Sequence, residues 1–244
     1  MIFGTFNEFG AMNSGPVFGA FQTSLDKAGV PWTKNINSSV NNWLRNASKF
    51  RQKKFDLDLQ PWRETANNKY ILICTQHNKS HQWRSMPPVD QWLEEQIKQI
   101  RKHTNRDIKI RPHPRSPVDP STIRQLNFNY KNVDLQYPKR YQQTYDEFDF
   151  DAALDGAHCV ISHSSNPGLQ AVVAGVPVFV GKESLAYDVS NKDYSRIESL
   201  HKPDRLIWFN NLLYTEYFID EIADGLPLVR LLPRLEKLVL AQNT

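Results

Sequence analysis

Residues 161–181 read ISHSSNPGLQAVVAGVPVFVG, and this stretch decides the fold. The strand-like run HCVISH (158–163) leads into it, followed by the polar loop SSNP, a helical pattern that ends at Gly175, and the apolar run VPVFVG. Glycine commonly ends a helix because it adopts the left-handed conformation without steric cost. The order strand, loop, helix, strand is typical of a parallel sheet, in which a crossover must connect neighbouring strands.

The same alternation extends back to residue 69. The strand-like runs KYILICTQ (69–76) and IKIRPHP (108–114) are each followed by a loop and a helical pattern. Further helices are expected in VDQWLEEQIKQIRKHT, STIRQLNFNY and DFDAALDGA, with a brief strand in DLQYP. The sequence therefore predicts an α/β fold with a parallel sheet that helices cover on both faces.

The two ends of the chain carry weaker patterns. The run IFGTF, a polar loop and a helical pattern ending at Gly29 indicate the first strand-to-helix step of a second Rossmann-like part. One amphipathic helix is expected over 40–50, and the region after 205 reads as helical. We expect a reduced N-terminal lobe over 1–66, a Rossmann-like domain over 67–204 and C-terminal helices over 205–244.

Composition is that of an ordinary globular chain. Hydrophobic residues make up 40% and charged residues 23%, with neither a long apolar run nor a signal-peptide pattern at the start. We therefore expect a cytoplasmic protein without a membrane span. The net charge of +4 suits an anionic ligand or nucleic acid. Cys74 and Cys159 lie in apolar runs without metal-type spacing, and we expect buried free thiols.

Three polar loops follow predicted strands, at 76–84, 112–117 and 162–168. Because parallel strands end at one edge of the sheet, these loops are expected to line a ligand site there. In the second loop, Arg111, His113 and Arg115 alternate, and two guanidinium groups with an imidazole match the oxygens of a phosphate. The alternative is a proline-shaped turn with solvated arginines.

In the third loop, Ser164 and Ser165 directly precede Asn166 and Pro167. The hydroxyls are therefore expected at the cap of a helix that begins near Pro167. A helix start binds phosphate through its free N–H groups and its positive dipole end. The alternative is a plain N-cap with no ligand.

The segment after the Ser pair, GLQAVVAGVPV, resembles the donor-binding signature of GT-B glycosyltransferases. That signature is a strand, a Ser or Thr pair, a helix of the form G-L-E-A-x-x-x-G, and then P-V with an apolar strand. His113 with Pro114 is similar to a motif of bacterial sialyltransferases, polysialyltransferases and capsule Kdo transferases. The resemblance covers about 70–190 and implies that His113, Ser164 and Ser165 hold the phosphate of a nucleotide sugar. Gln170 stands where these families commonly carry a Glu for the ribose hydroxyls, which leaves the donor open.

The resemblance also implies a GT-B arrangement with an acceptor-side N-terminal lobe and a donor-binding C-terminal lobe. It implies metal-independent transfer with a nucleotide sugar, such as a UDP-sugar, as co-substrate and no cofactor. The expected donor-binding residues are Gln76, Arg111, Arg115, Ser164, Ser165, Asn166 and Gln170, with His113 as a catalytic residue.

A catalytic base is expected from the N-terminal lobe in inverting members of this fold. Glu8, in the loop after the first predicted strand, is the best-placed carboxylate, and its alternative role is that of a surface loop residue. Asn7, Asn13 and Ser14 are expected to support the acceptor in the same loop.

A narrower resemblance concerns small GT-B-like proteins of tailed bacteriophages. It rests on PW before the first long strand, on TNRDIKIRPHPRS and on DRLIWFNNLLYTEYFIDEIADG. This resemblance implies a hydroxymethylated pyrimidine in phage double-stranded DNA as the acceptor, and the host cytoplasm as the location. Three alternatives stay open: a capsule or lipopolysaccharide glycan as acceptor, a UDP-sugar epimerase of the same fold, and a non-catalytic module that binds nucleic acid or anions.

Overall fold

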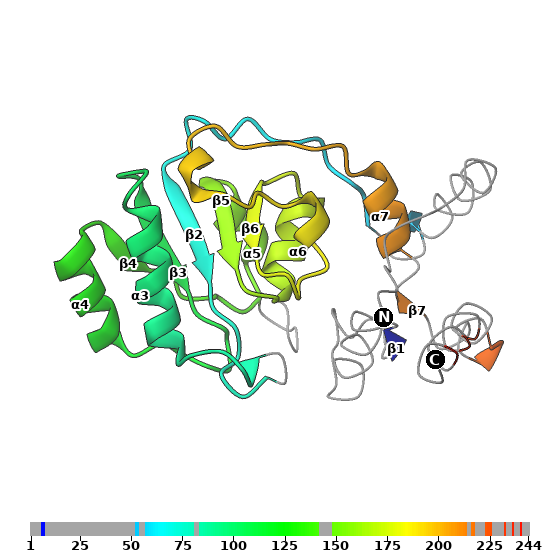
Figure 1. The fold of residues 1–244 in the computed structure, drawn as a ribbon, viewed down its shortest axis with the longest axis horizontal. Helices are drawn as coiled ribbons and strands as arrows, with labels where there is room; N and C mark the ends of the chain where they lie inside the picture. The colour runs from blue at the N-terminus through cyan, green and yellow to red at the C-terminus, as the bar shows by residue number, and fades with distance from the viewer. Residues whose placement is uncertain are drawn as a thin grey trace. The chain divides into compact units, whose positions relative to one another are not determined.

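A computed structural model describes residues 6–7, 52–53, 57–80, 83–141, 148–213, 216–217 and 223–225, together with 232, 236 and 240. The chain divides into two compact units, one formed by Leu59–Asp204 and the other by Met1–Asp58 with Arg205–Thr244. The unit Leu59–Asp204 contains the long strands and the helices beside them (Figure 1).

The sheet of this unit has five strands in the order β4-β3-β2-β5-β6. All four neighbouring pairs are parallel. The strands are β2 (Tyr70–Cys74), β3 (Asp107–Arg111), β4 (Val133–Leu135), β5 (Ala157–Ser162) and β6 (Val178–Val180). The predicted α/β fold with a parallel sheet is confirmed.

Helices alternate with these strands as the sequence predicts. They are α3 (Val89–Ile100), α4 (Pro120–Tyr130), α5 (Phe150–Leu154) and α6 (Asn166–Val173), followed by the short 3₁₀ helices η2 (Tyr187–Val189) and η3 (Tyr194–Arg196). Asp119 begins α4 because its carboxylate accepts the N–H of Ser121 at 2.7 Å.

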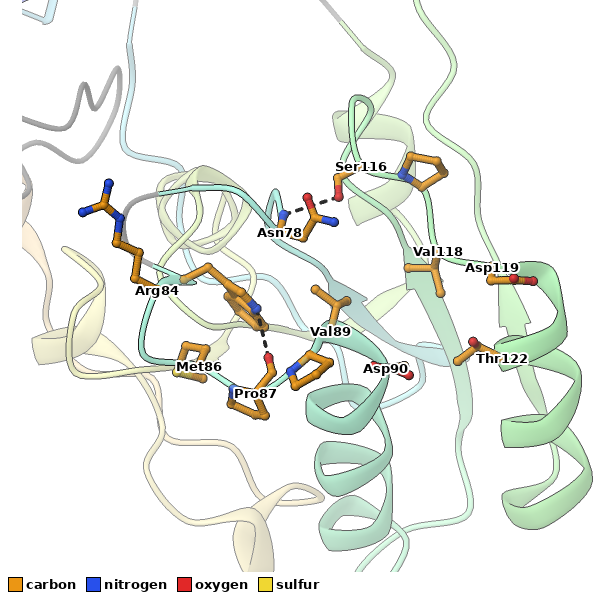
Figure 2. Close-up of a pocket in the computed structure, with 13 residues that line it drawn as sticks. Asn78, Arg84, Met86, Pro87, Val89, Asp90, Ser116, Val118, Asp119 and Thr122 are labelled. Carbon is orange, nitrogen blue, oxygen red and sulfur yellow. Dashed lines mark hydrogen bonds between the residues drawn. The ribbon is translucent and has the colours of Figure 1, made fainter.

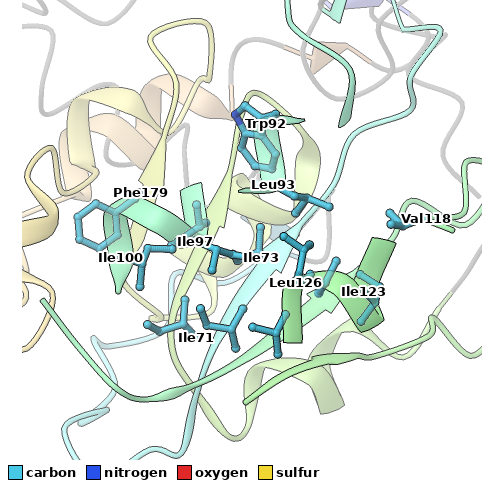
Figure 3. Packing of buried hydrophobic residues seen from close by; sticks show 14 of the residues in the cluster. Ile71, Ile73, Trp92, Leu93, Ile97, Ile100, Val118, Ile123, Leu126 and Phe179 are labelled. Carbon is cyan, nitrogen blue, oxygen red and sulfur yellow. The ribbon is translucent and has the colours of Figure 1, made fainter. Parts of the chain in front are cut away.

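One face of the sheet packs against α3 and α4 (Figure 3). Alternate strand residues such as Ile71 and Ile73 meet Leu93 and Ile97 of α3, and all four side chains are fully buried. Burying an aliphatic side chain of this size contributes about 1.5–3 kcal/mol relative to its exposed state. This apolar face anchors the strands whose ends carry the polar loops.

The opposite face packs against α5 and α6. Tyr70, which alternates with Ile71, donates its hydroxyl to the carbonyl of Ala153 in α5 at 2.8 Å. At Gly168 in α6, an added Cβ would lie 2.7 Å from Ser162 Oγ and 2.8 Å from Val180 Cγ1. Only glycine therefore allows α6 to approach β5 and β6 this closely.

Residues 59–63 run along the end of α6. Gln60 N–H donates to Val173 O at 2.9 Å, and Arg63 N–H donates to Gly175 O at 2.7 Å. Gly175 has a φ of 84°, and a Cβ there would overlap the Pro61 carbonyl. These bonds tie residues 59–63 to the sheet unit, although the sequence places residues up to 66 with the N-terminal lobe.

In the other unit, β1 (Phe6–Asn7) pairs antiparallel with β7 (Glu216–Tyr217), and α7 spans Leu206–Leu212. The expectation of helix throughout the region after 205 is wrong at β7. Its partner lies more than 200 residues earlier in the chain, and two-residue strands carry no readable period. The expected helix over 40–50 lies outside the described residues. Over the part of the chain with described placement, no helix has the length and apolar character to cross a bilayer.

Candidate functional site

The strand order reverses between β2 and β5, since the chain builds β2, β3 and β4 outward on one side and β5 and β6 on the other. In open parallel sheets, ligands bind beyond the carboxyl ends of the strands at such a switch point. Gln76 follows β2 and Ser164 follows β5. Gln76 Oε1 accepts the Ser164 hydroxyl at 3.0 Å and the Ser164 N–H at 3.3 Å. The two loops at the switch point are therefore joined directly.

The loop after β3 meets the same segment. Thr75 Oγ1 accepts the His113 N–H at 3.1 Å, and the rings of His77 and His113 lie edge to face with centroids 5.2 Å apart. His113 thus contacts residues 75–77 through Thr75 and His77, whereas Ser164 contacts them through Gln76. The three polar loops predicted from the sequence gather around the segment after β2.

The region after β3 is a turn and does not continue the strand. Ser116 N–H donates to His113 O at 2.9 Å, and Arg115 N–H donates to His113 Nδ1 at 3.1 Å. Because Nδ1 accepts, the neutral ring carries its proton on Nε2 and can donate from there. Arg115 is exposed, so the alternation expected for Arg111, His113 and Arg115 stops where β3 ends at Arg111.

Three side chains form a row across the ends of the strands on the α5 and α6 face. Cys74 is opposite Arg111, and the register that pairs Ile73 with Ile161 places Ser162 next to Cys74 on the other side. Burial raises the pKa of the Cys74 thiol to about 12, although the Arg111 charge opposes this shift. The thiol is therefore protonated at neutral pH. The row presents a guanidinium, a thiol and a hydroxyl, all of which can donate.

Arg111 and Ser162 are almost fully buried, at 5% and 3% exposure. Even so, Arg111 Nη1 and Ser162 Oγ have no hydrogen-bond partner. Leaving a buried polar group unpaired costs about 1–3 kcal/mol. Both groups are donors, and acceptor oxygens of a ligand at this edge would pair them.

Ser165 adds a third unpaired donor at the start of α6. It occupies the N-cap position, one residue before the helix begins at Asn166, but its side chain makes no capping bond. Its buried Oγ has no partner. Among described residues, the only other buried side-chain N or O atom without a partner is Gln136 Oε1. The plain N-cap considered from the sequence does not account for this hydroxyl.

Arg111 is held from its other side by Asp149. Arg111 Nη2 donates to Asp149 Oδ1 at 2.7 Å. Burial raises the pKa of Asp149, but the hydrogen bonds from Arg111 and from the Lys139 N–H, with the charges of both residues, outweigh it and hold this pKa below its usual value. The carboxylate is therefore ionised at neutral pH.

Sequence reasoning missed Ser162 and Asp149. In the strand HCVIS, alternate side chains point to the same face, so His158 and Ser162 are polar residues on one face of a buried strand. This pattern could have identified Ser162 from the sequence. Asp149 carries no such signal, because its contact with Arg111 spans 38 residues.

The remaining expected residues are spread more widely. Gln170 is exposed on α6, and Asn166 is half-buried at its first position. Asn7 lies in β1, in the other unit. Glu8, Asn13 and Ser14 lie outside the described residues.

Two cavities lie near the carboxyl ends of the strands, on the side of the sheet that α3 covers. One, of about 640 Å³, opens between the loops after β2 and β3 and the starts of α3 and α4 (Figure 2). The Asn78 N–H donates to Ser116 Oγ at 3.3 Å across it. The other, of about 300 Å³, is lined by aromatic side chains that include Trp92 and Tyr194 and by Lys182 and Lys192.

No family model and no curated protein matches the sequence. Among solved structures, the chain is similar to the beta Kdo 2,7 transferase KpsC of Thermosulfurimonas dismutans, with a TM-score of 0.43 and 15% identity. The similarity covers 80% of this chain and 64% of that one, so the chain spans less than two thirds of its neighbour.

Proposed function

We propose that this chain is a glycosyltransferase of the GT-B kind, and that its sheet unit holds a nucleotide sugar by the phosphate. The observation that carries the proposal is the buried Ser165 hydroxyl, which stands at the start of α6 without capping it and without any partner. A phosphate oxygen would pair this hydroxyl and face the positive end of the helix dipole.

Arg111 and Ser162 offer two more unpaired donors at the same edge of the sheet. Phosphate oxygens are acceptors only, and guanidinium groups bind them with strong charge-assisted hydrogen bonds. In the proposed reaction these donors stabilise the charge that collects on the departing nucleotide. Donors fixed before the reaction stabilise developing charge without reorganisation.

His113 is proposed as the donor of a hydrogen bond to the leaving phosphate. Its Nδ1 is occupied by the Arg115 N–H, which directs the ring proton to Nε2. The ring is half-buried, and its backbone N–H donates to Thr75 in the segment after β2. In the same segment, Gln76 accepts the hydroxyl of Ser164. Gln76 and Asn166 are proposed to support the donor, as are Arg115 and Gln170.

For the acceptor we propose a hydroxymethylated pyrimidine in bacteriophage DNA, with a capsule or lipopolysaccharide glycan as the alternative. The support is the sequence resemblance to small phage proteins and the net charge of +4. Glu8 is proposed as the base that deprotonates the acceptor, and Asn7, Asn13 and Ser14 are proposed as residues that support the acceptor.

The test incubates the full chain with a panel of nucleotide sugars and either hydroxymethylated duplex DNA or lipopolysaccharide. Digested nucleosides and released glycans are then examined for a sugar mass shift. We expect transfer by the wild type, a loss of at least about 100-fold in Ser165→Ala and His113→Ala, and no loss in the exposed control Ser199→Ala.

Other outcomes separate the alternatives. Isomerisation or hydrolysis of the donor without any acceptor would favour the epimerase. A wild type that neither transfers a sugar to any acceptor nor alters any donor would leave only a non-catalytic binding module and would overturn the proposal.

A further inference from the structure

Asp149 occupies the N-cap position of α5 but does not cap it. Elsewhere in the sheet unit, Asp119 and Asp193 stand at the same position of their helices and accept the N–H groups of Ser121 and Ser195. An N-cap aspartate normally stabilises its helix through such a bond. The Asp149 carboxylate is instead turned toward Arg111.

The Asp149 carboxylate makes two contacts through the same oxygen. Oδ1 accepts Arg111 Nη2 at 2.7 Å and the Lys139 N–H at 2.8 Å. The Asp149 N–H in turn donates to Lys139 O at 3.0 Å. Asp149 is therefore held by two hydrogen bonds to the backbone of Lys139 while its carboxylate binds Arg111. These bonds fix the position of the carboxylate.

The Arg111 guanidinium is planar, so holding one of its nitrogens constrains the direction of the other. Asp149 holds Nη2, and the guanidinium carbon lies 5.7 Å from the centre of the Phe150 ring. Nη1 is left buried and without a partner. One terminal nitrogen of the guanidinium, Nη2, thus donates to the protein, and the other, Nη1, can donate to a ligand.

We propose that Asp149 is the positioning residue of the phosphate site: it fixes Arg111 by Nη2 so that Nη1 faces the bound oxygen together with Ser162. This inference rests on the proposed function, because it assigns a role within the same anion site. Asp149 itself does not touch the phosphate. It acts only through the orientation of Arg111.

Charge alone predicts the opposite effect of removing Asp149. A carboxylate close to an anion site repels the anion, so its neutralisation would tighten binding. Positioning predicts weaker binding, because a free guanidinium must be ordered by the ligand itself. Replacing residues that orient the ligands of a metal site typically changes metal affinity 10–100-fold, and we expect an effect of about the same size here. The sign of the effect therefore separates the two accounts.

The experiment measures inorganic pyrophosphate binding to the full chain by isothermal titration calorimetry. We expect Asp149→Asn to weaken binding by about 10–100-fold. The control is Asp151→Asn, an equal charge change at an exposed position two residues away, which we expect to leave affinity unchanged or slightly tighter. In an Arg111→Lys background, which retains the charge but lacks the fork, we expect Asp149→Asn to cause no further loss of affinity.

Circular dichroism checks that each variant is folded. Should Asp149→Asn fail to fold, Asp149→Glu keeps the charge but shifts the carboxylate by one methylene, and we expect it to weaken binding at least about threefold by displacing the fork. Wild-type affinity in the folded Asp149 variant, or an equal loss in the Arg111→Lys background, overturns the positioning role alone. Failure of the wild type to bind pyrophosphate overturns the proposed phosphate site and this inference with it.

Discussion

The Ser164 hydroxyl donates to Oε1 of Gln76 at 3.0 Å and thereby connects the ends of β5 and β2, the two strands between which the sheet order reverses. Both side chains are buried. Gln76 also donates from Nε2 to Ser80 Oγ at 2.9 Å, which extends the connection into the loop after β2. This link holds the two loops of the candidate site in one arrangement before any ligand arrives.

Replacing Gln76 with Ala should therefore destabilise the fold as well as the site. Gln76→Ala leaves the buried Ser164 N–H and hydroxyl without this acceptor, and we expect a loss of about 1–3 kcal/mol in the free energy of unfolding. Urea denaturation measures it. Gln91→Ala, at an exposed position of α3, is the control and should change stability by less than about 0.5 kcal/mol. Equal stability of the two variants would mean that the link does not hold the loops.

Removing the unpaired Ser162 hydroxyl should have the opposite effect on stability. Ser162 Oγ is buried without a partner, so Ser162→Ala removes a desolvated group and no hydrogen bond. We expect unchanged stability or a gain of up to about 1 kcal/mol by urea denaturation, together with pyrophosphate binding at least about tenfold weaker. A variant that loses stability and keeps its affinity would show that the hydroxyl belongs to the fold and not to a ligand site.

Adding a single methyl group at Gly168 should disturb both α6 and Ser162. The new Cβ would lie 2.7 Å from Ser162 Oγ and 2.8 Å from Val180 Cγ1, which forces one of the elements to move. We expect Gly168→Ala to lower the midpoint of thermal unfolding and to cost about 1–3 kcal/mol, although Ala favours a helix by about 1 kcal/mol. The double variant with Ser162→Ala removes one of the two overlaps and should recover part of the loss. Stability at or above wild type would show that α6 does not approach the strands this closely.

Acid should destabilise the sheet unit through two paired carboxylates. The pKa of Glu198 is lowered, chiefly by hydrogen bonds from Arg106, and burial only partly opposes this. The pKa of Asp149 is also lowered, despite burial, by Arg111 and the Lys139 N–H. Groups with a lowered pKa in the folded state stabilise it above their unfolded pKa and lose that contribution as pH falls through the folded value.

We therefore expect the free energy of unfolding to be level near neutral pH and to decrease below about pH 4, where unfolded carboxyl groups titrate. Urea denaturation between pH 7 and pH 3 measures this, in ranges where unfolding is reversible. Glu198→Gln should show a shallower decrease, because it lacks one of the groups whose protonation is linked to unfolding. Stability that rises toward low pH would contradict the pairing of both carboxylates.

The centre of the fold could be predicted because each segment carries its own period. Buried parallel strands such as Tyr70–Cys74 are continuous apolar runs, and α3 places Trp92, Leu93, Ile97 and Ile100 on one face. The polar loops at the strand ends followed from the same pattern, and so did the N-cap position of Ser165. These features depend on residues close together in the sequence.

What could not be predicted depends on contacts between distant residues. The pairing of Arg111 with Asp149 joins two segments that nothing in the sequence relates, and β1 meets β7 from the far end of the chain. The expected convergence of Arg111 with His113 and Arg115 assumed that the strand continues. The strand ends at Arg111 because the His113 carbonyl and Nδ1 organise a turn.

The most direct test of the phosphate site compares the binding of uridine diphosphate and of uridine by isothermal titration calorimetry, in the wild type and in Ser165→Ala. We expect the diphosphate to bind the wild type at least about 100-fold more tightly than the nucleoside, and Ser165→Ala to lose about tenfold for the diphosphate alone. Equal affinities for the two ligands, or a Ser165→Ala variant that binds the diphosphate as tightly as the wild type does, would contradict the account.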